Sequence, residues 1–234
     1  MTTNEKKELK KQAAKYMVVV MMQRILGLVC FLLAAGTLFD ARGWIYFSIY
    51  FIVSIITLVV MSNNHAETLS ERGKKHENTK SWDKLFLGIY VPSAFYIIYI
   101  VAGLGVRFQW PILSTTFIYI GTFLYVISTM LGVWSIIENK HFESTSRIQD
   151  DRNQTVITTG PYRLVRHPGY SSIIIWAISV PMILGSLYTG IVSAIIIVTI
   201  TIRTYFEDSM LKKELSGYME YADKVKYRLI PFAW

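Results

Sequence analysis

The chain has 234 residues, of which 53% are hydrophobic, and a formal net charge of +8. Its single cysteine, Cys30, excludes an intramolecular disulfide, and its apolar residues form long runs that are unusual in a soluble domain. The residues from 169 to 202 include no Asp, Glu, Lys or Arg. Because long uncharged runs are typical of transmembrane segments, we expect a membrane protein and not one that binds nucleic acid.

Four apolar segments in the first 138 residues are long enough to cross a bilayer core as helices, which takes roughly 20 residues each. They run over 17–39, 44–61, 85–106 and 111–137. We expect Pro111 in the first turn of its helix, where its missing N–H is not needed.

Three residues in these segments suit the membrane boundary. Arg24 lies near the start of the first segment, so we expect its long side chain to extend to the membrane surface. Trp44 and Tyr46, at the start of the second segment, suit an interfacial aromatic belt.

The uncharged segment 169–202 is too long for one straight crossing, because a helix of that length would reach about 50 Å. Pro181 and Gly185 offer places to break it. We therefore predict a helical hairpin with two short arms, 171–184 and 188–202, which brings the apolar segments to about six.

The predicted fold is all-α, a polytopic integral membrane helical bundle with a C-terminal hairpin. We expect two regions along the chain. Residues 1–138 form an N-terminal four-span region, and residues 139–234 form a second region of loop, hairpin and C-terminal exit helix.

The positive charges alternate along the chain. Lys and Arg number five in residues 1–15, five in 62–84, five in 139–168 and six in 203–234. The intervening turns contain only Arg42 and Arg107. Because positive residues favour the cytoplasmic side, we expect both termini and both long loops to be cytoplasmic.

The loop over residues 62–84 is open to two interpretations. It is either a surface helix or a solvated connection, and the sequence favours neither. Its charged and aromatic residues include Glu71, Arg72, Lys74, Lys75, Trp82 and Asp83.

Several kinds of active site are excluded by their missing motifs. The chain has no G-x-S-x-G elbow, no P-loop, no G-x-G-x-x-G and no H-E-x-x-H. One Cys and four dispersed His leave few metal ligands, so no metal site is expected. We expect His65, His76 and His141 at the surface, because they lie in polar loops.

Two regions remain as candidates for chemistry. In the loop that begins at 139, Gly160-Pro161 and His167-Pro168-Gly169 fix the backbone at two points. The alternative is a membrane-surface loop whose Arg163 and Arg166 bind anionic head groups. After the hairpin, Arg203 and Glu207 share one helix face, where they form either an ion pair or part of a functional site.

These two regions together resemble the isoprenylcysteine carboxyl methyltransferase family and its relatives, the phospholipid N-methyltransferases. The similarity covers about residues 139–231. Asp208 stands where the family often has a second Glu, and Pro161-Tyr162-Arg163 is closer to prokaryotic members than to eukaryotic ones. The residues that carry the resemblance are Gly160-Pro161-Tyr162-Arg163, Arg166-His167-Pro168-Gly169-Tyr170, Arg203, Glu207-Asp208, Tyr218, Tyr221 and Arg228-Leu229-Ile230-Pro231, with Asn139, Phe142 and Gln149 before them and Lys80-Ser81-Trp82-Asp83-Lys84 in the earlier loop.

The resemblance implies an S-adenosylmethionine-dependent methyltransferase in a prokaryotic plasma membrane. Its acceptor would be a lipophilic or lipidated molecule that arrives from the bilayer and is methylated on a carboxylate. Arg203 would be the catalytic residue and would face the acceptor. The residues implied to enclose the cofactor are Gln149, Gln154, Thr155, Val156, Ile157, Tyr162, His167, Pro168, Gly169, Tyr170 and Glu207.

Three other functions stay open. A phospholipid or other amine N-methyltransferase would need a base, such as Glu207 or His167, to remove a proton. A sterol-type membrane reductase would bind NADPH, since such enzymes carry loops similar to R-H-P-x-Y. A membrane scaffold without activity would tolerate the loss of His167, Arg203 and Glu207.

Overall fold

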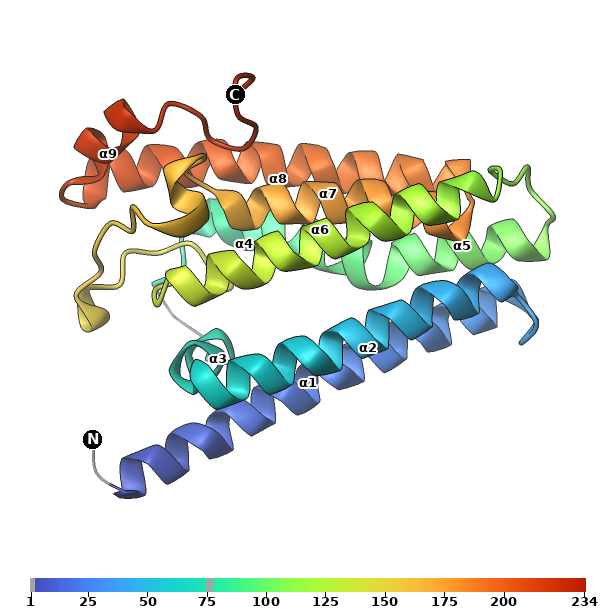
Figure 1. Cartoon of the computed structure of the whole chain (residues 1–234), viewed down its shortest axis with the longest axis horizontal. Helices are drawn as coiled ribbons and strands as arrows, with labels where there is room; N and C mark the ends of the chain where they lie inside the picture. Colours follow the sequence, from blue (N-terminus) through green and yellow to red (C-terminus); the bar gives the residue numbers. More distant parts are fainter. Residues whose placement is uncertain (1–2, 75–77) are drawn as a thin grey trace.

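The computed structural model describes residues 3–74 and 78–234 (Figure 1). Within these residues every regular element is a helix, and one isolated bridge pairs Ile112 with Ser186. The predicted all-α class is confirmed. In chain order the elements are α1 (Thr3–Ala35), α2 (Ala41–Asn64), α3 (Ala66–Arg72), α4 (Ser81–Pro92), the π-helix Ser93–Ile97, α5 (Ile98–Arg107), α6 (Thr116–Glu138), the 3₁₀ turns Asp150–Arg152 and Gly160–Arg163, α7 (Pro168–Leu184), α8 (Leu187–Glu214) and α9 (Tyr218–Lys224).

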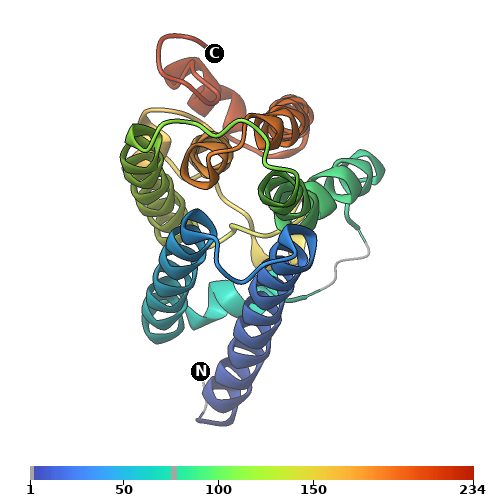
Figure 2. The ribbon, with the colours of Figure 1, turned by 90° about the vertical axis from the view of Figure 1, so that its right-hand side faces the viewer.

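Five stretches of the described residues have the length and apolar composition of a membrane crossing. They lie side by side along the long axis of the molecule and form a bundle when seen end-on (Figures 1 and 2). The helix α7 is also apolar but has 17 residues, about 26 Å of helix. The predicted polytopic membrane bundle is thus confirmed. The five stretches are Lys7–Ala35, Ala41–Asn63, Ser81–Arg107, Thr116–Glu138 and Leu187–Glu214.

The third crossing is interrupted, although the sequence predicts one continuous segment. It consists of α4, a five-residue π-helix and α5. Pro92, the last residue of α4, lacks the N–H that would bond to the carbonyl four residues earlier. The wider π turn that follows adjusts the hydrogen bonds locally, and such turns are often found at functional sites.

The predicted position of Pro111 is wrong. The helix α6 begins at Thr116, and Pro111 lies in the extended segment before it. This segment is held against the turn between α7 and α8, because the N–H of Leu113 donates to the backbone oxygen of Gly185 at 3.0 Å. The hydrogen bond to that turn takes the place of the helical hydrogen bonds that would form if α6 began at Pro111.

The hairpin forms as predicted, but only its first arm is short. Gly185 ends α7 in the left-handed conformation, with φ 74°, which glycine adopts without strain. The helix α8 then continues for 28 residues to Glu214. It therefore includes both the second arm and most of the predicted exit helix, and the short α9 follows it.

The bundle interior contains a tyrosine that the sequence placed at the membrane boundary. Tyr46 is 0% exposed, and its hydroxyl lies 2.9 Å from that of Tyr99. It packs beside Phe47 and Tyr50 in the main core cluster. The aromatic-belt prediction is wrong for Tyr46, because its hydroxyl finds a partner inside the bundle, whereas Trp44 is exposed.

Arg24 also lies inside the bundle and does not extend to the surface as predicted. Its Nε donates to Ser54 Oγ at 2.5 Å, and its Nη1 donates to Tyr50 OH at 3.1 Å. Hydroxyl groups on α2 therefore provide within the bundle the hydrogen bonds that water would provide at the surface.

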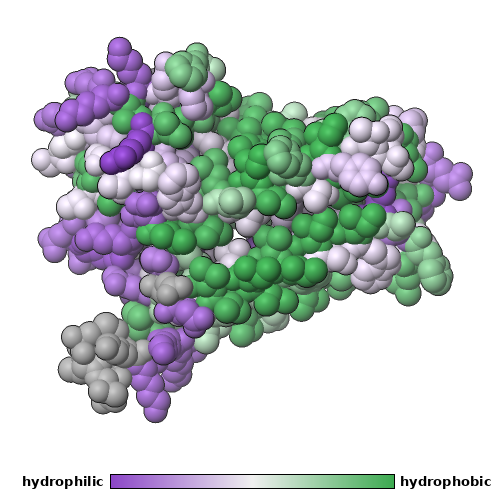
Figure 3. All heavy atoms as spheres, in the orientation of Figure 1, coloured by the Kyte–Doolittle hydropathy of each residue, from purple (hydrophilic) through white to green (hydrophobic). Residues whose placement is uncertain are grey.

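The surface separates into an apolar middle and polar ends (Figure 3). Hydrophilic side chains gather at the end where α1 begins and where α3, α9 and the loop between α6 and α7 lie (Figures 1 and 3). The long loops and both terminal regions thus share one end, as the charge pattern requires. The loop over 62–84 contains a helix, α3, while Lys75 and His76 lie outside the described residues.

Candidate active site

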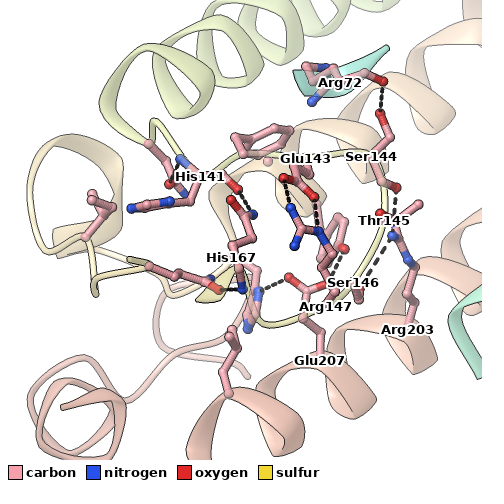
Figure 4. A pocket seen from close by; sticks show the side chains of 18 of the residues that line it. Arg72, His141, Glu143, Ser144, Thr145, Ser146, Arg147, His167, Arg203 and Glu207 are labelled. Atoms are coloured by element: carbon pink, nitrogen blue, oxygen red, sulfur yellow. Dashed lines mark hydrogen bonds and ion pairs between the residues drawn. The ribbon is translucent and has the colours of Figure 1, made fainter. Parts of the chain in front are cut away.

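A cavity of about 360 Å³ lies at this polar end of the bundle. Its volume falls within the range of small-molecule sites, roughly 300–1,000 Å³. Two kinds of wall meet in it. The apolar wall comes from α1, α4 and the π-helix, and consists of Val19, Val20, Leu87, Tyr90, Val91 and Phe95. The polar wall comes from the loop between α6 and α7, from the start of α7 and from α8 (Figure 4).

Arg203 of α8 lines the polar wall and is only 4% exposed. Its Nε donates to Asp83 Oδ1 at 2.6 Å, and its Nη2 donates to the backbone oxygen of Ser144 at 3.1 Å. The guanidinium also lies 5.1 Å from the centroid of the Tyr170 ring. The spacing of Arg203 and Glu207 left an intrahelical ion pair open, but the ion pair that forms joins Arg203 to Asp83 of α4.

Glu207 lies one helical turn further along α8 and enters the same cavity. Its Oε2 accepts hydrogen bonds from Tyr170 OH and Ser146 Oγ, both at 2.5 Å. Its Oε1 lies 4.0 Å from His167 Nδ1. The carboxylate is thus fixed through one oxygen and presents the other beside His167 (Figure 4).

Asp208 is fully buried and contacts five side chains, among them Lys212 of α8, whose Nζ lies 3.2 Å from Oδ2. Arg166 donates to both of its oxygens, at 2.6 and 3.0 Å. Tyr218 OH donates to Oδ1 at 3.1 Å, and Arg228 Nε donates to Oδ2 at 3.0 Å. His167 Nε2 lies 3.4 Å from Oδ1, so its ring bridges Asp208 and the neighbouring glutamate.

The same network holds the segment that follows α9. Arg166 Nη1 donates to two backbone oxygens just after α9, at 2.6 and 2.9 Å. The N–H of His167 donates to the backbone oxygen of Arg228 at 2.9 Å. Arg166 is therefore inside the protein, which is inconsistent with head-group binding, whereas Arg163 is exposed.

His141 is 5% exposed, so its predicted surface position is wrong. Its backbone oxygen accepts a hydrogen bond from Gln149 Nε2 at 2.7 Å, which draws the loop inward. Its Nε2 accepts the N–H of Thr155 at 3.4 Å. Burial, followed by the nearby charges of Arg152 and Lys140, lowers the pKa of His141 and favours the neutral ring that this contact requires.

Two glutamines predicted to bind the cofactor also shape the loop. The N–H of Gln149 donates to Oε1 of Gln154 at 2.8 Å. Gln149 Oε1 in turn accepts from Arg152 Nη1 at 3.0 Å. Much of their hydrogen-bonding capacity is therefore used inside the loop.

The structure brings ten of the eleven residues predicted for the cofactor, together with Arg203, to this cavity. Pro168 is the exception, because it is buried in the first turn of α7 and does not line the cavity. Gly169 allows close packing there, since an added Cβ would lie 2.5 Å from the Phe142 ring. The predicted residues that line the cavity are Gln149, Gln154, Thr155, Val156, Ile157, Tyr162, His167, Gly169, Tyr170 and Glu207.

Sequence reasoning missed the part of the cavity that comes from the first half of the chain. Apolar residues within a span carry no pattern that distinguishes a cavity wall from a lipid-facing surface. In this half, the resemblance of residues 80–84 and the charges of Arg72 and Asp83 close to span ends are signals that could have pointed to the site. The missed residues are Tyr16, Val19, Val20, Gln23, Arg72, Leu87, Tyr90, Val91 and Phe95 on the cavity wall, and Asp83 behind it.

Three buried atoms on the cavity wall lack hydrogen-bond partners among residues 3–74 and 78–234. They are Nη1 of Arg72, Nδ1 of His141 and Oγ1 of Thr145. A buried polar group left unpaired costs roughly 1–3 kcal/mol. Because all three line the same cavity, they are available to hydrogen-bond with a polar ligand there.

Comparisons with known proteins match parts of the chain. Residues 119–213 match the isoprenylcysteine carboxyl methyltransferase family. A probable protein-S-isoprenylcysteine O-methyltransferase of Oryza sativa subsp. japonica is 30% identical over 110 residues, 46% of this chain and 58% of that protein. Protein-S-isoprenylcysteine O-methyltransferase B of Arabidopsis thaliana is 26% identical over 142 residues, 59% of this chain and 70% of that protein.

The match therefore covers less than two thirds of the rice relative's length. The family match, over residues 119–213, includes the whole loop between α6 and α7, all of α7, and α8 through Arg203, Glu207 and Asp208. These elements form the polar wall of the cavity. Residues 119–213 are therefore similar to the isoprenylcysteine carboxyl methyltransferase family.

Proposed function

We propose that the protein is an S-adenosylmethionine-dependent carboxyl O-methyltransferase that acts on a lipophilic acceptor at the cytosolic face of its membrane. The observation that carries the proposal is that the polar wall and the apolar wall line the same cavity. A polar, charged cofactor and an acceptor with a long apolar chain require these two environments side by side.

The polar wall fits the cofactor by the chemistry of its groups. Glu207 supplies a carboxylate for the ammonium group of S-adenosylmethionine, beside the aromatic ring of Tyr170. Nδ1 of His141 and Oγ1 of Thr145 are buried, unpaired and available to its polar groups. When bound, the cofactor supplies a methyl group on a sulfonium, and its leaving sulfide is neutral. We assign the other predicted cofactor residues that line the cavity to this wall as well.

The residues of the chain then act by positioning and by excluding water. A carboxylate acceptor is already ionised near neutral pH, so no side chain has to remove a proton from it. Arg203, held by Asp83, places a fixed positive charge at the site, which favours the ionised acceptor. Glu207 is held by Tyr170 and Ser146, so neither charge needs to reorganise during the reaction.

The charge distribution supports a cytosolic position for the cavity. Most Lys and Arg residues lie in the segments 1–15, 62–84, 139–168 and 203–234, and the positive-inside rule favours a cytoplasmic position for these segments. We propose that residues 139–234 form the catalytic region, with the four-span region providing the apolar wall. The similarity of Pro161-Tyr162-Arg163 to prokaryotic members supports a prokaryotic plasma membrane.

The test is methyl transfer by purified protein in lipid nanodiscs. The protein is incubated with methyl-labelled S-adenosylmethionine and an N-acetylated S-prenylcysteine, and the lipid-soluble product is isolated. We expect a labelled methyl ester that mild base releases as methanol. A base-stable label in a lipid amine would instead assign the amine N-methyltransferase, and binding of NADPH without any response to S-adenosylmethionine would contradict methyl transfer altogether.

A further inference from the structure

The cavity is lined by four arginines, and three of them are paired with carboxylates. Arg147 binds Glu143 at 2.8 Å and Asp151 at 2.6 Å. Arg166 binds Asp208, and Arg203 binds Asp83, each at 2.6 Å. The fourth, Arg72, comes from α3, outside the region that matches the family.

Arg72 differs from the other three in its partners. Its Nε donates to Tyr16 OH at 3.2 Å, and its guanidinium lies 5.0 Å from the centroid of the Phe142 ring. Its Nη1 is buried and has no hydrogen-bond partner among the described residues on either side of 75–77. A guanidinium with a buried free donor is a ready site for an anion, because the cost of its desolvation is not yet offset.

The position of Arg72 joins the two walls of the cavity. Its partner Tyr16 precedes Val19 and Val20 of the apolar wall by one turn of α1, and all three line the cavity. Ser144 links it to the polar wall, because Ser144 Oγ donates to the backbone oxygen of Arg72 at 3.4 Å and the backbone oxygen of Ser144 accepts from Arg203 (Figure 4). Arg72 therefore lies where an apolar chain would end and a charged group would begin.

Arg203 is less well placed than Arg72 to bind an acceptor carboxylate. Its Nε and Nη2, which form one edge of the guanidinium, are already engaged by Asp83 and Ser144. On the strength of the proposed function, we propose that Arg72 binds one oxygen of the acceptor carboxylate through Nη1. The prenyl-like chain then lies along the apolar wall, and the second carboxylate oxygen stays free to take the methyl group.

The test compares a carboxylate with its neutral amide. Binding of an N-acetylated S-prenylcysteine and of its carboxamide is measured in nanodiscs for the wild type, Arg72→Gln and Arg72→Lys, alongside KM and kcat for the carboxylate. We expect the wild type to prefer the carboxylate, and Arg72→Gln to weaken its binding and raise its KM by about tenfold or more. Arg72→Lys should restore part of the preference, and S-adenosylmethionine binding should change less than twofold in both variants.

Lys74→Gln is the matched control, since it removes one positive charge two residues away. Lys74 is exposed, pairs with Glu71 and does not line the cavity, so its loss should leave acceptor binding unchanged. If Arg72→Gln and Lys74→Gln behave alike, or if Arg72→Gln keeps the preference for the carboxylate, the assignment of Arg72 is wrong even when methyl transfer occurs. If the wild type transfers no methyl group but prefers the carboxylate through Arg72, the binding site stands and the proposed function fails. If it neither transfers nor prefers the carboxylate, both are overturned.

Discussion

Arg203 donates a hydrogen bond at 2.6 Å to Asp83, a residue 120 positions earlier in the chain, and both side chains are buried. Asp83 uses its second oxygen to accept the N–H of Ser146 at 2.8 Å. This carboxylate therefore joins α4, the loop between α6 and α7, and α8 at the centre of the candidate site. Buried ion pairs of this kind depend on both partners, because either charge alone would be costly to bury.

Replacement of Asp83 by asparagine should therefore destabilise the protein and abolish most methyl transfer. Loss of one partner from a buried pair costs about 3 kcal/mol or more. The measurement is thermal unfolding in detergent together with labelled methyl transfer. Glu214→Gln is a matched control, because Glu214 at the end of α8 pairs at 2.8 Å with Lys80, which directly precedes α4, but does so at the surface. It should cost about 1 kcal/mol or less, and equal effects of the two variants would contradict the role of Asp83.

Glu207→Gln should weaken binding of S-adenosylmethionine by about tenfold or more, since a hydrogen bond to a charged group is worth about 1.5–3 kcal/mol. Tyr170→Phe should have a smaller effect, because it removes one of the two hydroxyls that hold Oε2 but leaves the charge. Titration calorimetry in detergent measures both. Glu220→Gln on α9, an exposed carboxylate, serves as the control. Unchanged affinity in Glu207→Gln would remove this residue from the cofactor site.

Asp208→Asn should loosen the segment that follows α9. The segment is held by Arg166 and Arg228, both of which bind Asp208. Hydrogen exchange of residues 225–234 should become faster, while exchange in α2 stays the same. Asp223→Asn, an exposed change in α9, should leave both rates unchanged. Protection that persists in Asp208→Asn would show that backbone bonds alone hold the segment.

The lowered pKa of His141 predicts that the folded protein loses stability in acid. Its pKa in the folded protein lies below the ordinary value of 6.5 because of burial and then the nearby positive charges. Well above pH 6.5 the ring is neutral in both folded and unfolded chains, and its stabilising contribution is complete. As the pH falls, the unfolded chain takes up the proton first, which lowers the free energy of unfolding by up to about 1.4 kcal/mol per pH unit. Melting temperatures below pH 6.5 should therefore fall more steeply for the wild type than for His141→Gln, and parallel curves would contradict this.

The proposed orientation predicts where added cysteines react. Asn153 and Ser216 lie at the polar end of the bundle, and the native Cys30 lies in α1. In a chain without Cys30, single cysteines at 153 and 216 should be modified by a membrane-impermeant maleimide only after the cells are opened. Labelling in intact cells would place the cavity on the outer face, away from the cytosolic cofactor.

The membrane spans could be predicted from the sequence because hydrophobicity over about 20 residues is a property of each segment alone. The direction in which a side chain points inside the bundle could not be predicted, since it depends on the neighbouring helices. Arg24 and Tyr46 lie in the predicted segments, yet both point to hydroxyls on another helix. The start of α6 was misplaced at Pro111 for the same reason, because contacts with a distant turn hold that residue in an extended segment.

The candidate site could be predicted only where its residues are close in sequence. The loop before α7 and the pair Arg203 and Glu207 carry recognisable motifs, and the structure places them on one wall. The partner of Arg203 could not be predicted, because Asp83 is separated from it by three helices and the loop between them. The half-buried Arg72 likewise resembled an ordinary loop charge until the fold placed it beside Tyr16.

The length of α8 gives the site a mechanical connection to the lipid around it. Its apolar first part lies within the bundle that crosses the membrane, and the same unbroken helix presents Arg203 and Glu207 to the cavity. Helices respond to a thinner or thicker hydrocarbon layer by tilting. A tilt of α8 would move both charged groups relative to Asp83 and Ser146, which belong to other elements. Bilayer thickness is thus a physical variable to which the geometry of this pocket is directly coupled.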